Sequence, residues 1–482
     1  MKRRVLVILL AFAVLHATGS SAIDVLSGQK TNDRRIGSKA FVLSEGRAGS
    51  DTAQAASTRL QPADFIYQGA FRLPDDFNWG AQGLSYYPLG DAGKGSLLVT
   101  GHDQVPVEFA EVSIPSPAIS ANWLSLPIAI RLRPFVEFDG DLIESYFDPW
   151  DTIWAGDIEY VPRRGAQTSD KIYGSLDHWY WVSDPSFPVV WFSEMDGSSP
   201  RGLFHVGPWE QPYHGNKQGD YLFTVPQWYA DRYLGGRTLV TGKCRGTEFG
   251  SMGPALFTFR PWATESPSGD LDAVPMLWYR FQPLCAAPNV TDKTRCDFPD
   301  FTMCDDWRGA SFVEAGSKQA IILLGVKGLG DNNYGTLPGG CRGDEQGYHC
   351  DPLERQVIFY DVDELGLVAQ GVRNAWNVVP YAIWRPTQFY LRDAQGHTCG
   401  DVGGMAFDSA TQRVFMIERG LGSLDDNSAV VHVWTVAGGT PIPAQKSHLE
   451  FLPLLLLITG PGLLCRRLIG RLLSASKRRR AR

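Results

Sequence analysis

The stretch FTMCDDWRG, residues 301–309, places two adjacent carboxylates beside an indole and a guanidinium. Asp305 or Asp306 could act as a general base or bind a cation, and Arg308 would lower the pKa of a neighbouring carboxyl group. Another acid, Glu418, follows a separate apolar strand further along the chain. Two carboxyl groups that face each other across a pocket are the minimum requirement for glycoside hydrolysis. We therefore predict Asp305, Asp306 and Glu418 as catalytic residues.

Other polar and aromatic residues recur just before an apolar strand that begins with glycine, or just after the strand that follows it. When the two strands pair antiparallel, these two loops lie at the same end of the sheet. Acids, bases and indoles gathered on one rim would form a polar and aromatic binding pocket. With one histidine from a long insertion added, the predicted ligand-binding residues are His102, Asp103, Trp154, Asp157, Asp177, His178, Lys243, Arg245, Trp307, Arg308, Lys327, His349, Asp401 and Arg419.

Each of these residues also has a purely structural explanation. Aspartate and glycine are ordinary turn residues, and a tryptophan at a repeated position can pack between neighbouring sheets. The grouping on one predicted rim, more than any single residue, favours a binding site.

The elements that would position these residues repeat along the chain. A strand that begins with glycine is followed by a turn, a hydrophobic strand, a polar loop and a third strand, in units that start at Gly83, Gly156, Gly219, Gly309 and Gly403. Such a unit cannot bury both of its faces alone, so the units must stack around an axis. We predict an all-β fold, a five-bladed β-propeller with long insertions, over residues 63–438.

Two alternative folds remain open. A sixth blade would be present if residues 117–146 contain a degenerate unit. Two β-sandwich domains would also show alternating strands, although they would not require the repeated order of strand, glycine-bearing loop and strand.

The two ends of the chain differ from this repeating body. Residues 1–22 have a basic start, an apolar run and small residues, which is the plan of a signal peptide, so we expect export. Residues 23–62 read as a flexible linker. In residues 439–482 an apolar run at 451–465 precedes an arginine-rich end, so we expect a membrane anchor or sorting tail, with a solvated basic tail as the alternative.

Charge excludes one class of partner. The chain has a net charge of −7, of which residues 1–22 contribute three positive charges and residues 451–482 eight, so the body between them carries −18. A body this acidic repels polyanions, so we expect no nucleic acid partner. We expect a monomer that contacts the membrane through its C-terminal tail.

Cysteine usage agrees with export to an oxidising compartment. All but one of the eight cysteines lie between Cys244 and Cys399, and we expect Cys285 to pair with Cys296 and Cys341 with Cys350. The sequence contains no Cys-x-x-Cys, G-x-S-x-G, P-loop or H-E-x-x-H motif. Structural zinc, serine hydrolase, nucleotide and zinc protease functions therefore lack their usual support.

The segments YQGAFRLP, GYHCDP and GGMAFD resemble those of uncharacterised exported bacterial propeller-like proteins. Five-bladed glycosidases and calcium-dependent lactonases are similar at the level of the fold, which transfers no residue. We expect an exported or surface-attached propeller that acts on a carbohydrate or a small ester, with calcium as a candidate cofactor. The alternative is a non-catalytic extracellular propeller that binds glycan or protein.

Overall fold

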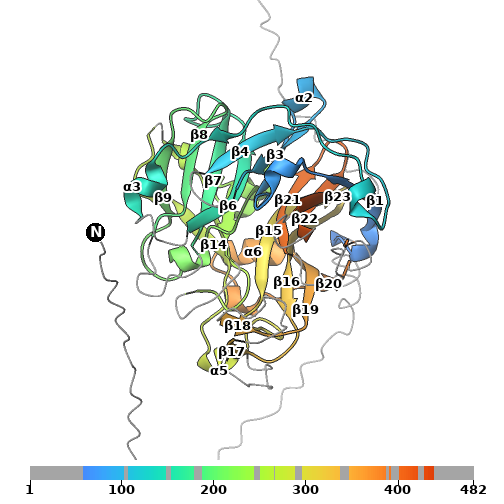
Figure 1. Ribbon diagram of the computed structural model, residues 1–482. Helices are drawn as coiled ribbons and strands as arrows, with labels where there is room; N and C mark the ends of the chain where they lie inside the picture. Colours follow the sequence, from blue (N-terminus) through green and yellow to red (C-terminus); the bar gives the residue numbers. More distant parts are fainter. Residues whose placement is uncertain are drawn as a thin grey trace, which may run out of the picture. The chain divides into compact units, whose positions relative to one another are not determined.

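The computed structural model describes residues 58–438, except for 103–106, 148–152, 179–186, 244–249, 265, 288–295, 337–346, 387–389, 392–400 and 422–427. Strands dominate this part of the chain, and they form five sheets of four or more strands. The predicted five-bladed β-propeller is therefore confirmed (Figure 1). Residues 136–137 form the outermost strand of the first blade, so the region considered for a sixth blade completes an existing one.

The first three blades follow one another along the chain. Blade 1 consists of β2 (Leu84–Tyr87), β3 (Ser96–Thr100), β4 (Glu108–Val112) and β5 (Val136–Glu137). Blade 2 consists of β6 (Ile153–Val161), β7 (Lys171–His178), β8 (Val190–Glu194) and β9 (Arg201–Val206), with β13 (Asp270–Leu271) parallel to β9. Blade 3 consists of β10 (Tyr221–Thr224), β11 (Leu239–Gly242), β12 (Leu256–Phe259) and β14 (Ala273–Leu277).

The last two blades complete and close the ring. Blade 4 consists of β15 (Asp306–Ala315), β16 (Lys318–Gly328), β19 (Leu353–Tyr360) and β20 (Ala382–Trp384). Blade 5 consists of β21 (Val402–Asp408), β22 (Arg413–Leu421), β23 (Ser428–Val436) and β1 (Phe65–Arg72). Because β1 is the first strand of the described residues and pairs with the last of them, β23, the ring is closed by hydrogen bonds between distant parts of the sequence.

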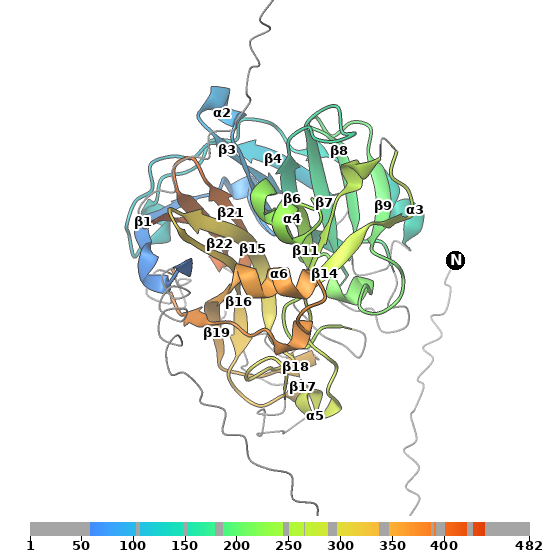
Figure 2. The same ribbon diagram turned by 180° about the vertical axis from the view of Figure 1, so that it is seen from behind.

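Short elements lie between and around the blades. The helices are α2 (Gly90–Gly93), α3 (Leu142–Tyr146), α4 (Gln227–Tyr233), α5 (Pro283–Ala286) and α6 (Val362–Ala369). Figures 1 and 2 show α5 beside the hairpin of β17 (Asn333–Gly335) and β18 (Gly347–His349), at the end of the fold next to blade 4. Among the described residues, no helix combines the length and the hydropathy needed to cross a membrane.

Glycine leads each repeat because the innermost strands crowd together at the axis. These strands adjoin in the order β2, β6, β10, β15 and β21, and β21 adjoins β2 again. A Cβ atom on Gly156 would lie 1.7 Å from the carbonyl oxygen of Gly219 in the next repeat, and one on Gly403 would lie 2.3 Å from that of Ala81. No side chain fits at such a distance, so the repeated glycine is a packing requirement of the ring.

The core lies between the blades, because both faces of a sheet are covered by its neighbours. In β16, Ile321 and Leu323 join the cluster shared with blade 3, whereas Ile322 and Leu324 join the cluster shared with blade 5. All four side chains are fully buried. The continuous apolar run in this strand therefore reflects burial on both faces.

Two carboxyl groups of β6 link three innermost strands. One oxygen of Asp157 accepts the backbone N–H groups of Leu84 and Ile158 at 2.9 and 2.8 Å, and the other accepts that of Leu222 at 2.9 Å. Asp157 is 1 % exposed. It thus accepts hydrogen bonds from backbone groups at the inner edges of blades 1, 2 and 3. Asp157 was predicted to bind a ligand, but the contacts observed for it are these structural ones.

Glu159 makes the equivalent links two residues later. It accepts the hydroxyl of Ser85 at 2.7 Å, and both the N–H and the hydroxyl of Thr224 at 2.9 Å. Burial raises the pKa of this carboxyl group to about 7, although the hydrogen bonds oppose the shift. The folded protein therefore binds this proton more tightly than the unfolded chain does.

This raised pKa predicts a pH dependence of stability. The contribution of Glu159 is fully present below its unfolded pKa, about 4.3, and is lost as the pH rises through about 7. Between pH 5 and 8 the wild-type protein should lose on the order of 2 kcal/mol of stability as Glu159 ionises. Glu159→Gln keeps a neutral hydrogen-bonding group, so the variant should not show this loss. Urea unfolding across this range measures the effect. The exposed Glu137→Gln is the control, and equal pH slopes in all three proteins would contradict the prediction.

Candidate functional site

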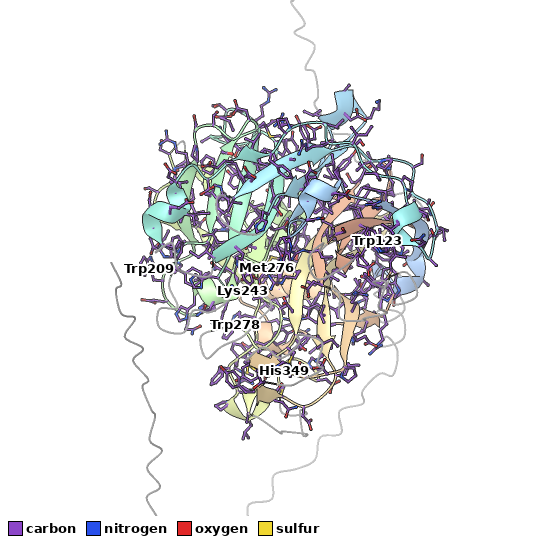
Figure 3. The ribbon with its side chains drawn as sticks, in the orientation of Figure 1. Trp123, Trp209, Lys243, Met276, Trp278 and His349 are labelled. Atoms are coloured by element: carbon purple, nitrogen blue, oxygen red, sulfur yellow. A yellow bond between two sulfur atoms is a disulfide. The ribbon has the colours of Figure 1, made fainter. Side chains whose placement is uncertain are left out.

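A group of charged side chains joined by ion pairs comes from blades 2, 3 and 4. Asp177 lies near the end of β7, Lys243 directly follows β11, and Asp220 directly precedes β10. Asp306 and Arg308 lie at the start of β15. We call these five residues the axial cluster. Figure 3 shows Lys243 in the middle of the fold.

Ion pairs join the members of the axial cluster into one network. The amine of Lys243 lies 3.0 Å from Oδ1 of Asp177 and 3.6 Å from Oδ1 of Asp220. Arg308 donates to the other oxygen of Asp177 and lies 2.5 Å from Oδ1 of Asp306. Arg308 therefore connects Asp177 to Asp306, while Lys243 connects Asp177 to Asp220.

The environment separates the pKa values of two adjacent carboxyl groups. Burial alone would raise the pKa of Asp177, but Lys243 and Arg308 hold it well below its usual range. Burial, together with the charge of Asp177, raises the pKa of Asp220 to about 6. Asp220 also forms a side-chain hydrogen bond with Asp177. In weak acid the pair therefore combines a proton donor with a permanent carboxylate, which is the arrangement used in acid–base catalysis.

The cluster is more accessible at one side than at the other. Asp220 and Asp177 are 0 % and 1 % exposed, whereas Asp306 is 7 % exposed and Arg308 is partly exposed. Trp154 is half-buried and stands opposite Asp177 in the pairing of β6 with β7. Asp306, Arg308 and the neighbouring indole are therefore the groups that solvent reaches, whereas Asp220 is shielded from it.

Four of the predicted site residues, Asp177, Lys243, Asp306 and Arg308, are brought together here. Asp220 was missed by the sequence analysis. The signal for it is the Gly219-Asp220 pair, which repeats the Gly156-Asp157 pair at the same point of the preceding unit. The two aspartates have different structural roles, because Asp157 is held by backbone N–H groups and Asp220 lies beside charged side chains.

Asp305 lies in a separate, structural ion pair. Its Oδ1 accepts the amine of Lys327 at 2.8 Å, the hydroxyl of Thr302 at 2.7 Å and the N–H of Gly328 at 3.1 Å. Lys327 also donates to the carbonyl oxygens of Asp300 and Gly328. Both predicted site residues thus fix the loop that precedes β15.

Glu418 belongs to a third cluster, between blades 4 and 5. One of its oxygens lies 2.7 Å from Nε2 of His432 and accepts the N–H of Leu391 at 2.8 Å. The other lies 3.3 Å from the guanidinium of Arg355 on β19. Because these partners lie on the interface of the two blades, the structure shows a structural role for Glu418 and gives no support for its predicted pairing with Asp305 or Asp306.

The remaining predicted site residues are dispersed. Trp307 is fully buried and packs against Phe298, so it belongs to the core. His178 is the exception, because its carbonyl oxygen accepts the amine of Lys243 at 3.1 Å; its ring packs near Phe147, with centroids 5.8 Å apart. His102 and Asp401 are exposed, and Arg419 donates to Gln82.

His349 is buried in β18, on the hairpin beside blade 4 (Figure 3). The predicted residues Asp103 and Arg245 lie outside the described residues.

The disulfide prediction is confirmed for one pair and corrected for the other. Cys285 is bonded to Cys296, as expected. Cys350 is bonded to Cys304 and not to Cys341, because the chain after β18 lies against the loop that precedes β15. The bond therefore ties the insertion to the corner that carries Asp305.

This pairing predicts the effect of removing each cysteine. Cys304→Ala with Cys350→Ala opens a closed loop and should lower the free energy of unfolding by about 2–4 kcal/mol. Cys341→Ser leaves this bond intact and should lower the free energy of unfolding by less than the double variant does. Chemical denaturation under oxidising conditions measures both, and peptide mapping without reductant should recover Cys304 linked to Cys350. A loss of stability in Cys341→Ser equal to that in the double variant would contradict the assignment.

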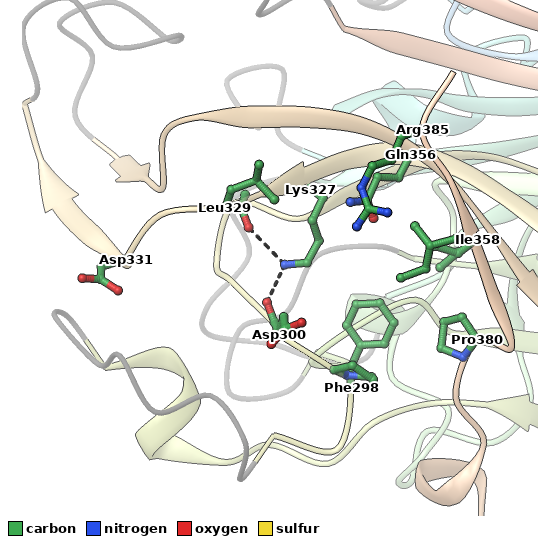
Figure 4. Close-up of a pocket in the computed structure, with 12 residues that line it drawn as sticks. Phe298, Asp300, Lys327, Leu329, Asp331, Gln356, Ile358, Pro380 and Arg385 are labelled. Atoms are coloured by element: carbon green, nitrogen blue, oxygen red, sulfur yellow. Dashed lines mark hydrogen bonds between the residues drawn. The ribbon is translucent and has the colours of Figure 1, made fainter. Parts of the chain in front are cut away.

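A cleft of about 410 Å³ lies on blade 4 (Figure 4). Its walls come from the loop before β15, the end of β16, and the outer strands β19 and β20. Apolar side chains alternate with polar ones around it, among them Phe298, Asp300, Gln356, Ile383 and Arg385. Of the residues that line the cleft, only Lys327 was predicted from the sequence as a site residue.

No metal centre emerges from the part of the chain that the structure describes. Within it, no group of three or more histidine, cysteine, aspartate or glutamate side chains is arranged to hold a metal ion. We therefore assign no ligands for the calcium ion considered from the sequence.

Comparison with known proteins identifies no family for this chain. No family model and no curated protein matches the sequence. Among solved structures, GH43B of the Bacteroides ovatus xyloglucan PUL is similar with a TM-score of 0.33 and 9 % identity, over 75 % of this chain and 53 % of that one. Raptor from Chaetomium thermophilum gives 0.28 and 7 %, over 82 % and 31 %. The chain thus spans about half of the first protein and a third of the second, and neither similarity carries a functional argument.

Proposed function

We propose that this propeller is a hydrolase that cleaves glycosidic bonds in a carbohydrate at the axial cluster. One observation carries the proposal: a single network of ion pairs holds Asp220 together with the carboxylates of Asp177 and Asp306, and burial with the charge of Asp177 raises the pKa of Asp220 to about 6. A protonated carboxyl group and a carboxylate in one site are the two catalytic groups that glycoside hydrolysis requires.

Each residue of the cluster has a distinct role in this proposal. Asp220 protonates the leaving oxygen as the bond from that oxygen to the anomeric carbon breaks. Asp306, which is the more accessible carboxylate and is paired with Arg308, accepts a proton from the attacking water. Asp177 is a positioning residue, since its charge raises the pKa of Asp220. The half-buried Trp154 offers an apolar face on which a sugar ring can stack.

Export to the cell surface or the medium is part of the proposal. The two disulfides support an oxidising compartment, and the sequence of residues 1–22 supports secretion. The C-terminal apolar and basic segment supports attachment to a membrane.

A specific observation also favours a second function, the binding of a glycan without cleavage. Asp177, Asp220 and Lys243 are each less than 5 % exposed and pair with one another. A network this well shielded would serve as the rigid floor of a binding site, with Trp154 and Arg308 as the contacting residues.

Incubation of the purified protein with plant and bacterial polysaccharides and with aryl glycosides tests the proposal. New reducing ends, formed at a rate that falls as the pH rises through 6, are expected for a hydrolase whose acid is Asp220. Retention of a polysaccharide on affinity electrophoresis, with no reducing ends formed between pH 4 and 8, would overturn hydrolysis and leave the binding function.

A further inference from the structure

The cleft on blade 4 is separate from the axial cluster and has a built framework. The Cys304–Cys350 disulfide joins the loop on one side of the cleft to the chain that leads into β19 on the other. The Lys327–Asp305 ion pair fixes the same loop. The bond from Lys327 to the carbonyl oxygen of Asp300, drawn in Figure 4, fixes it as well. The cavity is therefore preformed, as ligand pockets usually are.

Part of the floor and part of the rim of the cleft are apolar. Phe298 and Ile358 are buried beneath it, whereas Leu329 and Ile383 at its edge are 50 % and 43 % exposed. Exposed aliphatic side chains beside a cavity favour a ligand that removes them from water. The body of the ligand is therefore apolar.

The charges of the cleft favour a cation. The amine of Lys327 uses its donors on Asp305 and on two carbonyl oxygens, and Arg385 is paired with Glu354 at 2.7 Å. Among the interactions that the structure describes, no hydrogen bond or ion pair is found for the carboxylates of Asp300 and Asp331, which are both exposed. The two lining cations are thus compensated, and the two lining carboxylates are not.

From these observations we propose that the blade 4 cleft binds an organic cation with an apolar body, an aliphatic chain that ends in an ammonium or guanidinium group. The chain packs on Phe298, Ile358 and Ile383, and the charged end lies toward Asp300 and Asp331. The site is independent of hydrolysis at the axial cluster.

Two sources offer this chemistry, a free alkylamine and the side chain of a lysine in a peptide. Calorimetric titration of the full chain with hexylamine, and with a Gly-Gly-Lys-Gly-Gly peptide blocked at both ends, tests them separately. Binding of either is expected, and the tighter of the two identifies the source. Hexanoate and hexanol are the matched probes for charge and for apolar contact, and both should bind at least fivefold more weakly.

Substitutions in the cleft show whether the binding is at this site. Asp300→Asn and Asp331→Asn should each weaken binding of the cationic probe two- to fivefold, as expected for partly exposed ion pairs. Ile383→Ala should weaken it further, and Asp231→Asn, an exposed acid on α4, should not change it. Equal binding of hexanoate, no binding of either cation, or affinity unchanged in all three cleft variants would overturn the proposal.

Discussion

Replacing Asp157 by alanine should destabilise the propeller by roughly 3 kcal/mol or more. Three buried backbone N–H groups, those of Leu84, Ile158 and Leu222, donate to this one carboxyl group. Each loses its acceptor in the variant, and an unsatisfied buried donor costs about 1–3 kcal/mol. No water replaces the carboxyl group easily, because the site lies where the innermost strands are closest.

Asparagine at the same position provides the matched comparison. Its carbonyl oxygen can still accept the N–H groups of Leu84 and Ile158, but its amide faces the N–H of Leu222, so only part of the loss should occur. Urea denaturation should therefore rank the proteins wild type, Asp157→Asn and Asp157→Ala in order of decreasing stability. An alanine variant within 1 kcal/mol of wild type would show that Asp157 does not hold the inner strands together.

Changing Asp220 to asparagine should lower turnover of a cleaved carbohydrate by about 10²–10⁴-fold, the usual contribution of a general acid. Asparagine has nearly the same shape and remains beside Asp177 and Lys243, but it cannot supply a proton. The reduced rate should also lose its decrease above pH 6, since that decrease reports the deprotonation of Asp220.

The chain offers a matched control for this variant. Asp139 is also fully buried, and burial together with the charge of Glu144 raises its pKa to about 6. It lies between β5 and α3 and outside the axial cluster. Asp139→Asn should therefore leave the catalytic constants unchanged. Equal losses of turnover in Asp139→Asn and Asp220→Asn would indicate a general effect of buried acids on folding and would contradict the catalytic role.

The fold was predictable because its signal is repeated and local. Strand alternation and a leading glycine recur five times, and the glycine reflects the close approach of the innermost strands at the axis. The closing strand β1 was not predictable from the repeat, because it belongs to no unit of its own and pairs with β23 across the length of the chain.

The site was predictable only in part, because the fold fixes where a loop lies but not where its side chains point. Asp177 and Arg308 were expected near each other and are joined. Glu418 and Arg419 are neighbours in β22, yet alternate side chains on a strand face opposite ways, so the first contacts blade 4 and the second contacts Gln82 before blade 1. Adjacent Asp305 and Asp306 are likewise divided between two ion pairs.

The disulfide error has a related cause. Cys341 and Cys350 are close in sequence, whereas Cys304 is brought to Cys350 by the pairing of β16 with both β15 and β19. Sequence separation favours a local pair, and only the sheet register reveals the distant one.

Carbon NMR of protein labelled at the aspartate carboxyl groups shows directly whether Asp220 is a neutral acid below about pH 6, beside an ionised Asp177. The account predicts a signal that titrates near pH 6, disappears in Asp220→Asn and persists in Asp139→Asn. If Asp220→Asn retains every aspartate signal that titrates above pH 5, Asp220 is ionised like an ordinary surface acid, and the proposed acid–base site is contradicted.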